Sequence, residues 1–369
     1  MKKSLDYYKA WIREYTRRLD VSTPRSPFNF YVMNRNPLII FTITHGSLAN
    51  LFYMSDVLSS TPATFIVGFT WDISAPKKSL RVAREYREYI QRFSATKQVM
   101  FLCNSQQELD ALAGERVPCI FANRSIFQDE SIFVVHEVER QYPAILNSRM
   151  GRYKRIELAQ EIDDIAIITS ECDHEYMAEM RRCFRSAKWL NYRTGIYTRL
   201  SAHEVAVEVS RAHTGLILSR QEGHCNASIE YLLCGTPVVS TPSSGGRDMF
   251  YDEEYTIVVD ADPQAVKKGV AELIDRHVDP NVVRNRTLER LDRHRKTLVR
   301  YLNSVLVSAN RPPRTVEEWF SKWNNKMKFF CEPSSFEVLV HSDYFERDVF
   351  YSTDVKAREA YPDLFLAFS

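Results

Sequence analysis

The sequence predicts an α/β protein of two successive units, each a mostly parallel β-sheet with helices on its faces, followed by a helical C-terminal extension. Three observations predict this. The chain has 369 residues, which is enough for two domains of ordinary size. Short apolar runs alternate with helical stretches, as they do in parallel sheets. The alternation ends near residue 135 and then restarts, so the pattern occurs twice.

The first unit has four predicted buried strands, at residues 38–44, 64–69, 98–103 and 118–122. Ahead of them, residues 4–20 predict an amphipathic helix, because apolar side chains recur on one face at helical spacing. A break rich in Pro and Ser, at residues 22–27, separates this helix from the first strand.

The second unit has six predicted strands, at residues 142–147, 165–169, 188–192, 215–219, 237–240 and 255–260. The predicted helices between them are at residues 154–162, 203–212, 225–234 and 264–276. Both units are therefore expected to be Rossmann-like domains facing a cleft. Ligands of open α/β sheets bind at the carboxyl ends of the strands, which is where the site is expected.

The expected domains are residues 1–138, residues 139–310, and a helix and tail over residues 311–369 that pack back on the N-terminal domain. Two further helices are predicted, at residues 282–310 and 315–328. Residues 276–300 hold eight Lys or Arg against three Asp or Glu. This basic stretch has two interpretations: packing between parts of the chain, or attachment to an anionic membrane surface or lipid-linked acceptor.

The bulk composition excludes several classes of protein. A net charge of +2 gives no global field for a nucleic acid, which makes that partner unlikely. Seven cysteines without a CxxC pair indicate buried thiols in a reducing compartment, not a disulfide framework or a zinc site. No signal peptide and no run of 18 apolar residues is present. We expect a cytoplasmic protein, with peripheral contact to the inner face of a membrane left open.

The stretch from Gly215 to Gly246 is unusually rich in glycine. It holds five of the eleven glycines of the chain within 32 residues. Read physically, LILS is a strand, Ser219 to Gly223 a turn, and a helix begins near His224 and ends before Gly235. The strand TPVVST and the loop SSGG follow. Both loops are expected at the carboxyl edge of the sheet, where free N–H groups can hold a phosphate or a sugar hydroxyl.

Two carboxylates flank this turn. Glu222 and Glu230 are eight positions apart, which on a helical rise separates them by on the order of 12 Å. That distance is too long for a shared proton or metal ion. It suits the two ends of one extended ligand.

The segment resembles the EX7E motif of retaining GT-B glycosyltransferases, especially family 4. The matching residues are Glu222-Gly223, Glu230, Gly235, Pro237-Val238-Val239 and Gly245-Gly246. The helix departs from the usual Glu-Ala-Met-Ala run, with Tyr231 and Leu232-Leu233-Cys234 in its place, and Asp248 stands where many relatives carry Glu. The resemblance implies a GT-B fold and covers about residues 140–300.

The same resemblance extends upstream to Arg149 and Lys154, which have the spacing of two cations that bind the donor's diphosphate. Fixed cations stabilise the charge that develops on a leaving nucleoside diphosphate without a metal ion. A basic group at a helix start is mildly unfavourable by itself, which also favours an anionic ligand.

Residue by residue, the resemblance implies that Glu222 contacts the donor sugar and that Glu230 accepts from the ribose hydroxyls. The backbone around the helix start holds sugar hydroxyls or phosphate, through Gly223, His224, Cys225 and Asn226. Ser244, Gly245 and Gly246 hold the diphosphate together with Arg149 and Lys154. His224 and Cys225 are interpreted as lining the pocket, because no third group orients them as a nucleophile pair.

Three other features have candidate roles in binding or catalysis. His45, in the loop that follows the first of the four strands, is a candidate for contact with acceptor or donor, or caps the next helix. Asp72, after a later strand, is a candidate for orienting an acceptor hydroxyl. Asp260-Ala261-Asp262 spells a metal motif of GT-A enzymes, but it precedes Pro263 and is interpreted as a helix cap, so no metal is assigned.

The expected function is transfer of a sugar from a nucleoside diphosphate sugar, used as a substrate with no further cofactor, to a glycan, lipid-linked or other biopolymer acceptor. Retention and independence of metal are expected. Two alternatives remain: an epimerase or hydrolase of nucleotide sugars on the same fold, and a non-catalytic binding protein. The nucleoside base, the sugar and the acceptor are not determined by the sequence.

Overall fold

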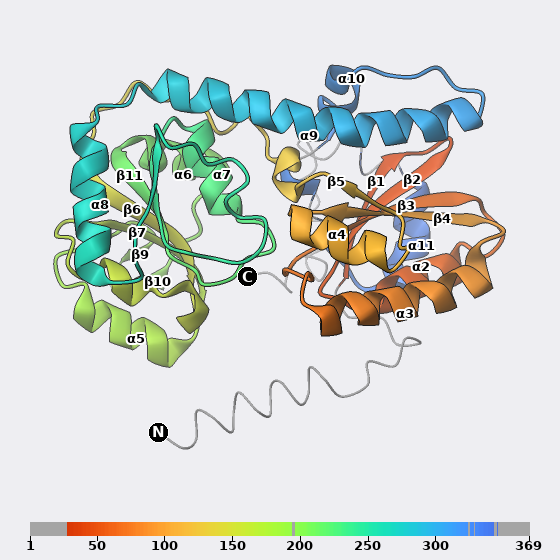
Figure 1. The fold of residues 1–369 in the computed structure, drawn as a ribbon, viewed down its shortest axis with the longest axis horizontal. Helices are drawn as coiled ribbons and strands as arrows, with labels where there is room; N and C mark the ends of the chain where they lie inside the picture. The colour runs from red at the N-terminus through yellow and green to blue at the C-terminus, as the bar shows by residue number, and fades with distance from the viewer. Residues whose placement is uncertain (1–27, 194–195, 324, 328, 343–344, 346–369) are drawn as a thin grey trace. The chain divides into compact units, whose positions relative to one another are not determined.

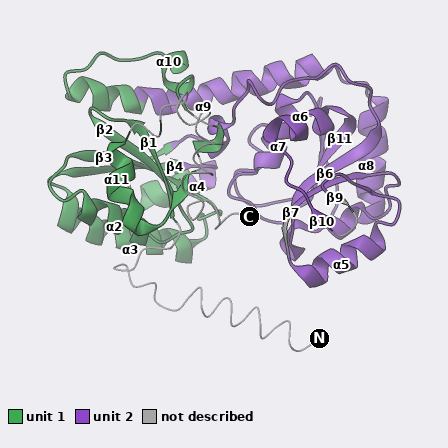
Figure 2. Ribbon diagram, turned by 180° about the vertical axis from the view of Figure 1, so that it is seen from behind, with its two compact units in different colours: residues 1–102, 109–120, 301–369 green, residues 103–108, 121–300 purple. Residues whose placement is uncertain are grey.

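The computed structural model describes residues 28–193, 196–323, 325–327, 329–342 and 345 (Figure 1). These residues form two compact units, coloured separately in Figure 2. Unit 1 lies within residues 1–102, 109–120 and 301–369, and unit 2 comprises residues 103–108 and 121–300. The helix predicted for residues 4–20 lies outside the described residues.

Unit 1 contains a six-stranded sheet of order β14-β1-β2-β3-β4-β5. Its strands are β1 (Phe28–Asn34), β2 (Leu38–Thr44), β3 (Ala63–Phe69), β4 (Lys97–Cys103), β5 (Cys119–Phe121) and β14 (Phe330–Cys331). The four predicted strands are confirmed as β2 to β5. Strands β2, β3 and β4 are parallel, whereas β1 pairs antiparallel with β2 and with β14. These antiparallel pairs make the sheet mixed. The sequence predicts neither β1 nor β14.

The helices α2 (Ala49–Val57) and α3 (Pro76–Phe93) follow β2 and β3, and Figure 1 draws both beneath the strands. Aromatic side chains join them. Phe52 of α2 meets Tyr89 of α3 edge-on, with ring centroids 5.4 Å apart. Tyr86 of α3 meets Phe101 of β4 at 5.8 Å. The apolar face of α3 therefore packs on the sheet that the sequence predicts beside it.

The C-terminal residues of unit 1 add aromatic side chains to the same sheet. The ring of Phe336 lies 4.8 Å from that of Phe30 on β1, and Phe345 lies 5.0 Å from the same ring. Helix α11 (Phe336–His341) carries the first of these rings, and α10 (Val316–Phe320) precedes it in the C-terminal part. Helix α4 (Gln106–Gly114) follows β4. Residues 315–328 do not form one helix, because α10 ends at Phe320 and Lys326 adopts φ +66°.

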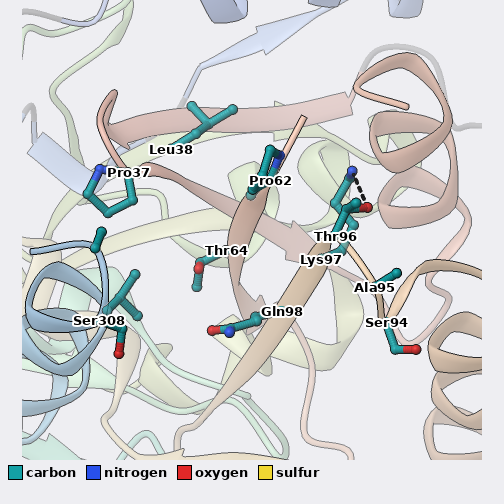
Figure 3. A pocket seen from close by; sticks show the side chains of 13 residues that line it. Pro37, Leu38, Pro62, Thr64, Ser94, Ala95, Thr96, Lys97, Gln98 and Ser308 are labelled. Carbon is teal, nitrogen blue, oxygen red and sulfur yellow. Dashed lines mark hydrogen bonds between the residues drawn. The ribbon is translucent and has the colours of Figure 1, made fainter. Parts of the chain in front are cut away.

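A cavity of about 290 Å³ lies at the amino ends of β2, β3 and β4 (Figure 3). Lys97 is its buried cation, and its ammonium donates to the carbonyls of Ser59 and Thr61 at 2.7 and 2.8 Å and to Thr96 Oγ1 at 3.0 Å. Burial lowers the pKa of Lys97. Its three donors are already used by the protein, and the cavity lies at the edge of the sheet opposite the carboxyl ends.

Unit 2 contains a fully parallel sheet of order β13-β12-β11-β6-β7-β8. Its strands are β6 (Tyr142–Met150), β7 (Ala166–Cys172), β8 (Lys188–Trp189), β11 (Ala212–Ile217), β12 (Val238–Ser240) and β13 (Thr256–Val258). The run at residues 188–192 is divided between β8 and a separate hairpin of β9 (Tyr192–Arg193) and β10 (Ile196–Tyr197). The parallel sheet predicted for this unit is confirmed.

Helices cover both faces of this sheet. On one face, α5 (His174–Cys183) and α8 (Pro263–Asp275) share a buried apolar cluster with Ala144 and Leu146 of β6. On the other face lie α6 (Ala202–Ser210) and α7 (Asn226–Leu233). Side chains alternate along a strand, so Ile145 and Asn147 of β6 belong to the face of α7.

Three local predictions have clear outcomes. Asp262 caps α8, accepting from the Ala265 N–H at 3.0 Å with Pro263 as the first helical residue, as predicted. The prediction of a helix at residues 154–162 is wrong. Two short 3-10 turns, Arg152–Lys154 and Ile156–Ala159, replace it, because Arg155 between them is left-handed with φ +52°. Helix α5 was not predicted, although Asp173 caps it.

Helix α9 (Pro280–Ser308) carries most of the basic stretch. Its arginines bind groups of unit 2. Arg284 donates to the carbonyls of Glu130 and Leu233 at 2.9 and 2.7 Å, and Arg290 pairs with Asp252 at 2.6 Å. Arg295 pairs with Glu130. These contacts support the packing interpretation of the basic stretch. Among the described residues, no helix is long and apolar enough to cross a membrane.

Candidate active site

The turn between β11 and α7 forms the centre of the site. Cys225 is the N-cap of α7, Cys234 its C-cap, and Gly235 follows with φ +70°, as the sequence predicts. Gly215 on β11 makes room for the helix, since a Cβ there would lie 2.1 Å from the ring of Tyr231. The buried Tyr231 ring therefore fixes how closely α7 approaches the sheet.

The turn pairs with the glycine loop that follows β12. Gln221 and Ser244 form a parallel bridge, and the Glu222 N–H donates to the Ser244 carbonyl at 3.1 Å. The N–H groups of Ser244 and Gly246 donate to the carbonyls of Arg220 and Gly223, at 3.2 and 2.8 Å. Of the three amides expected to hold a diphosphate, two thus already bind carbonyls of the facing turn. Gly245 between them has φ +96°.

The buried side chain of Arg247 binds the residues from which both loops begin. It is 1% exposed and donates to the Ser219 carbonyl at 2.6 Å and to Ser240 Oγ at 2.8 Å. Its Nε pairs with Asp248 at 2.7 Å. Burial lowers the pKa of Arg247, but Tyr251 and Asp248 outweigh burial and raise it overall. A permanent buried charge therefore ties the carboxyl ends of β11 and β12 together.

Arg155 strengthens the same edge. Its guanidinium donates to the Leu218 carbonyl and to Thr241 Oγ1, both at 2.7 Å. These bonds offset the conformational cost of the left-handed backbone at Arg155. As a result Lys154 is held beside the β11–α7 turn.

Lys154 and Glu222 form an ion pair at this turn. Their side chains are 17% and 9% exposed. Burial lowers the pKa of Lys154, but Cys225 and Glu222 raise it by more, to about 12. The lysine is therefore charged at neutral pH. The structure brings together the cation predicted for the diphosphate and the carboxylate predicted for the sugar.

Tyr153 lies among the same charges. The Lys154 ammonium sits 5.2 Å from the centre of its ring. Burial raises the pKa of Tyr153, with Lys154 and Arg149 lowering it and Glu222 raising it. Arg149 itself is an exposed residue near the carboxyl end of β6. Its charge thus acts in the same region as that of Lys154.

Cys225 and His224 are both buried within the turn. Burial and then the Glu222 charge raise the pKa of Cys225 to about 11. The thiol is neutral at physiological pH, and a neutral thiol is a poor nucleophile. This environment supports the pocket-lining interpretation. Asn226 begins α7 and is half-buried.

Glu230 lies in the second turn of α7 and is 3% exposed. One carboxylate oxygen accepts from Gln128 Nε2 at 3.0 Å and the other accepts from Asn147 Nδ2, also at 3.0 Å. Sequence reasoning missed both amides. The strand alternation of β6 could have identified Asn147, whereas Gln128 lies 102 residues away from Glu230 with no local signal.

Part of the chain matches a known family, and its fold is similar to that of solved structures. Residues 158–276 match the family described as "Glycosyl transferases group 1". HepE of Anabaena is similar in structure, with a TM-score of 0.52, 12% identity, and 72% of this chain and 78% of that chain covered. TarM of S. aureus has a TM-score of 0.51 and 14% identity, with 72% of this chain and 54% of that chain covered. No curated protein matches.

The chain has the GT-B fold. Together with the family match, this makes it a glycosyltransferase. The matched range contains the whole segment from Glu222 to Gly246, and it begins after Lys154. The family match therefore does not cover Arg149 and Lys154. Their assignment as diphosphate-binding cations rests on the sequence resemblance and, for Lys154, on the ion pair with Glu222.

The glycine loop of the transferase is also held by an asparagine, Asn123. Asn123 Nδ2 donates to the carbonyls of Asn104 and Gly246, at 2.9 and 2.8 Å. A Cβ on Gly246 would lie 2.1 Å from the Asn104 carbonyl oxygen. Gly246 thus serves close backbone packing within unit 2.

Replacing Gly246 by Ala is therefore expected to destabilise unit 2 by about 1–3 kcal/mol, because backbone, which cannot change rotamer, must move to admit the methyl group. Equilibrium unfolding in urea measures the loss. Gly114→Ala is the matched control, since a Cβ there meets nothing within 4 Å. Equal stability of the two variants would contradict the packing role of Gly246.

The two candidates in unit 1 lie at one edge of its sheet. His45 follows β2 and is exposed, and Asp72 follows the neighbouring parallel strand β3. Asp72 is 3% exposed, and its Oδ1 accepts from the Ser74 N–H at 2.9 Å, which is an Asx-turn. The predicted roles of both residues in catalysis stay predictions. Among the described residues, no cluster of three or more His, Cys, Asp or Glu could hold a metal ion.

Proposed function

We propose that this glycosyltransferase moves a sugar from a nucleoside diphosphate sugar to a glycan or lipid-linked acceptor, with retention of configuration and without a metal ion. The observation that carries the proposal is the ion pair of Lys154 and Glu222 at the carboxyl edge of the unit 2 sheet. It joins a permanent cation, suited to a diphosphate, to a carboxylate, suited to sugar hydroxyls.

In this proposal the donor extends along the β11–α7 turn. Glu230 binds the ribose hydroxyls, and Lys154 and Arg149 bind the diphosphate with the Gly245 region. Glu222 binds the sugar. Lys154 and Arg149 stabilise the charge of the leaving diphosphate, which is the task that a metal ion performs in other transferases. His45 and Asp72 are proposed to meet the acceptor from unit 1.

The HepE structure to which the chain is similar holds UDP. A uridine nucleotide is therefore the first donor to test. The proposed acceptor class rests on the sequence resemblance. The proposed acceptors share a hydroxyl group, on a sugar or on a lipid-linked molecule, that would receive the transferred sugar.

The first prediction is that one nucleoside diphosphate stabilises the full chain. At a hundredfold excess over Kd, the expected gain in unfolding free energy is about 2.7 kcal/mol. Thermal denaturation with UDP, GDP, ADP and CDP, and then with the matching nucleotide sugars, measures it. The gain should persist in EDTA. A panel in which no nucleotide shifts the transition would refute the proposal.

A hit is followed by product analysis. Incubation of the nucleotide sugar with candidate acceptors should give a glycoside whose anomeric configuration, read by NMR, equals that of the donor. Release of free sugar in the absence of acceptor would indicate the hydrolase alternative, and a changed donor stereocentre the epimerase. Binding without any turnover would indicate a non-catalytic protein.

A further inference from the structure

The residue that holds Glu230 from outside the motif is Gln128. It is 2% exposed and follows the 3-10 turn Arg124–Phe127. Its Nε2 donates to Glu230 Oε1 at 3.0 Å. Its Oε1 is buried and has no hydrogen-bond partner among the described residues. Turning the amide over would bring this oxygen against the carboxylate, so the contact with Glu230 fixes the amide in one orientation.

The segment of Gln128 is itself anchored to unit 2. Arg295 of α9 donates to the carbonyls of Ile126 and Gln128, at 3.2 and 3.4 Å. Arg284 donates to the Glu130 carbonyl at 2.9 Å. The amide that meets Glu230 is therefore carried on backbone held by two arginines.

The carboxylate of Glu230 consequently has one neutral amide on each oxygen, Gln128 on one side and Asn147 on the other. A carboxylate oxygen can accept more than one hydrogen bond, so binding one amide does not by itself exhaust either oxygen. Two vicinal hydroxyls need two acceptors at fixed spacing and orientation. A carboxylate restrained on both oxygens offers them without a loss of rotamer freedom on binding.

We propose that Gln128 is a positioning residue of the donor site, which restrains the Glu230 carboxylate in the orientation that binds the vicinal hydroxyls of the donor ribose. This inference rests on the proposed function, since that function assigns the ribose to Glu230. It extends the site to a segment that lies outside the family-matched residues 158–276. Gln128 acts through Glu230 and need not touch the ligand.

The test is calorimetric titration of the full chain with three probes: UDP, or the nucleoside diphosphate that binds best in the panel above, its 2′,3′-dideoxy form, and inorganic pyrophosphate. The variant is Gln128→Met, which keeps the length of the side chain and removes the donor. Gln141→Met is the matched control, because Gln141 is exposed and lies just before β6 in the same unit.

Wild-type protein should bind the ribose form about tenfold more tightly than the dideoxy form, and Gln128→Met should lose about tenfold for the ribose form alone, as for a hydrogen bond to a charged group. Affinities for the dideoxy form and pyrophosphate should change less than about twofold, because neither probe carries the hydroxyls that Glu230 binds. The ratio of the first two affinities thus falls towards one only in Gln128→Met.

The outcomes separate the two proposals. A wild-type protein that does not distinguish the ribose from the dideoxy form refutes the assignment of Glu230 to ribose, and this inference with it. A wild-type protein that distinguishes them, while Gln128→Met distinguishes them equally well, refutes the inference and leaves the proposed function intact. A variant that loses affinity equally for all three probes shows general structural damage and also overturns the positioning role.

Discussion

Glu222→Gln is expected to lower the rate of sugar transfer about 10²–10³-fold, the usual effect of removing one electrostatic group from the transition state. The affinity for the nucleoside diphosphate should stay equal or increase. Glu222 is paired with Lys154 in the structure, so its charge competes with a diphosphate for the same ammonium. Glutamine keeps the size and a hydrogen-bond acceptor but removes that competition.

The measurement is kcat for transfer, together with Kd for the diphosphate from titration. Glu208→Gln is a suitable control, because Glu208 is also ion-paired, to Arg211 at 2.6 Å, and lies on α6. Unchanged transfer in Glu222→Gln would remove Glu222 from the mechanism. A large loss of diphosphate affinity would instead show that Glu222 organises the whole turn.

Lys154→Met is expected to lower kcat/KM by about 10³-fold, because it removes the buried cation from the position of the leaving diphosphate. It should also weaken diphosphate binding, in the opposite direction to Glu222→Gln. Removing one partner of a well-buried pair further destabilises the fold, by up to about 3–5 kcal/mol. Both side chains here are mostly buried, at 17% and 9% exposed.

A double variant separates these effects. Lys154→Met with Glu222→Met replaces the pair by apolar groups, and should recover most of the stability while transfer stays absent. Lys188→Met is the matched control, because that exposed lysine also lies over an aromatic ring, at 5.0 Å from Tyr142, on the same sheet. Recovery of transfer together with stability in the double variant would mean that the pair is structural only.

The parts of the fold that could be predicted are those in which local pattern and global packing agree. Strands buried on both faces appear as continuous apolar runs, which is why the sequence predicts β2 and β3. The turn of α7 was found for a related reason. Gly235 takes a positive φ that few other residues adopt, and its position relative to Glu222 and Glu230 is typical of one motif.

The parts that could not be predicted depend on residues distant in sequence. β14 pairs with β1 across about three hundred residues, and a two-residue strand has no periodicity to detect. Gln128 and Glu230 meet only when unit 2 has folded. The turns after β6 have a helical composition, which predicts a helix, but the side-chain hydrogen bonds of Arg155 to the Leu218 carbonyl and to Thr241 override that propensity.

The division of the chain has a consequence for exchanging donor specificity between transferases. The chain passes between the units after residues 102, 108, 120 and 300, so the donor half is not a contiguous piece of sequence. A graft of residues 121–300 alone would leave behind Asn104, whose carbonyl contacts the glycine loop and accepts from Asn123. A functional donor module must therefore be assembled from two inserts, the longer one and the six residues 103–108.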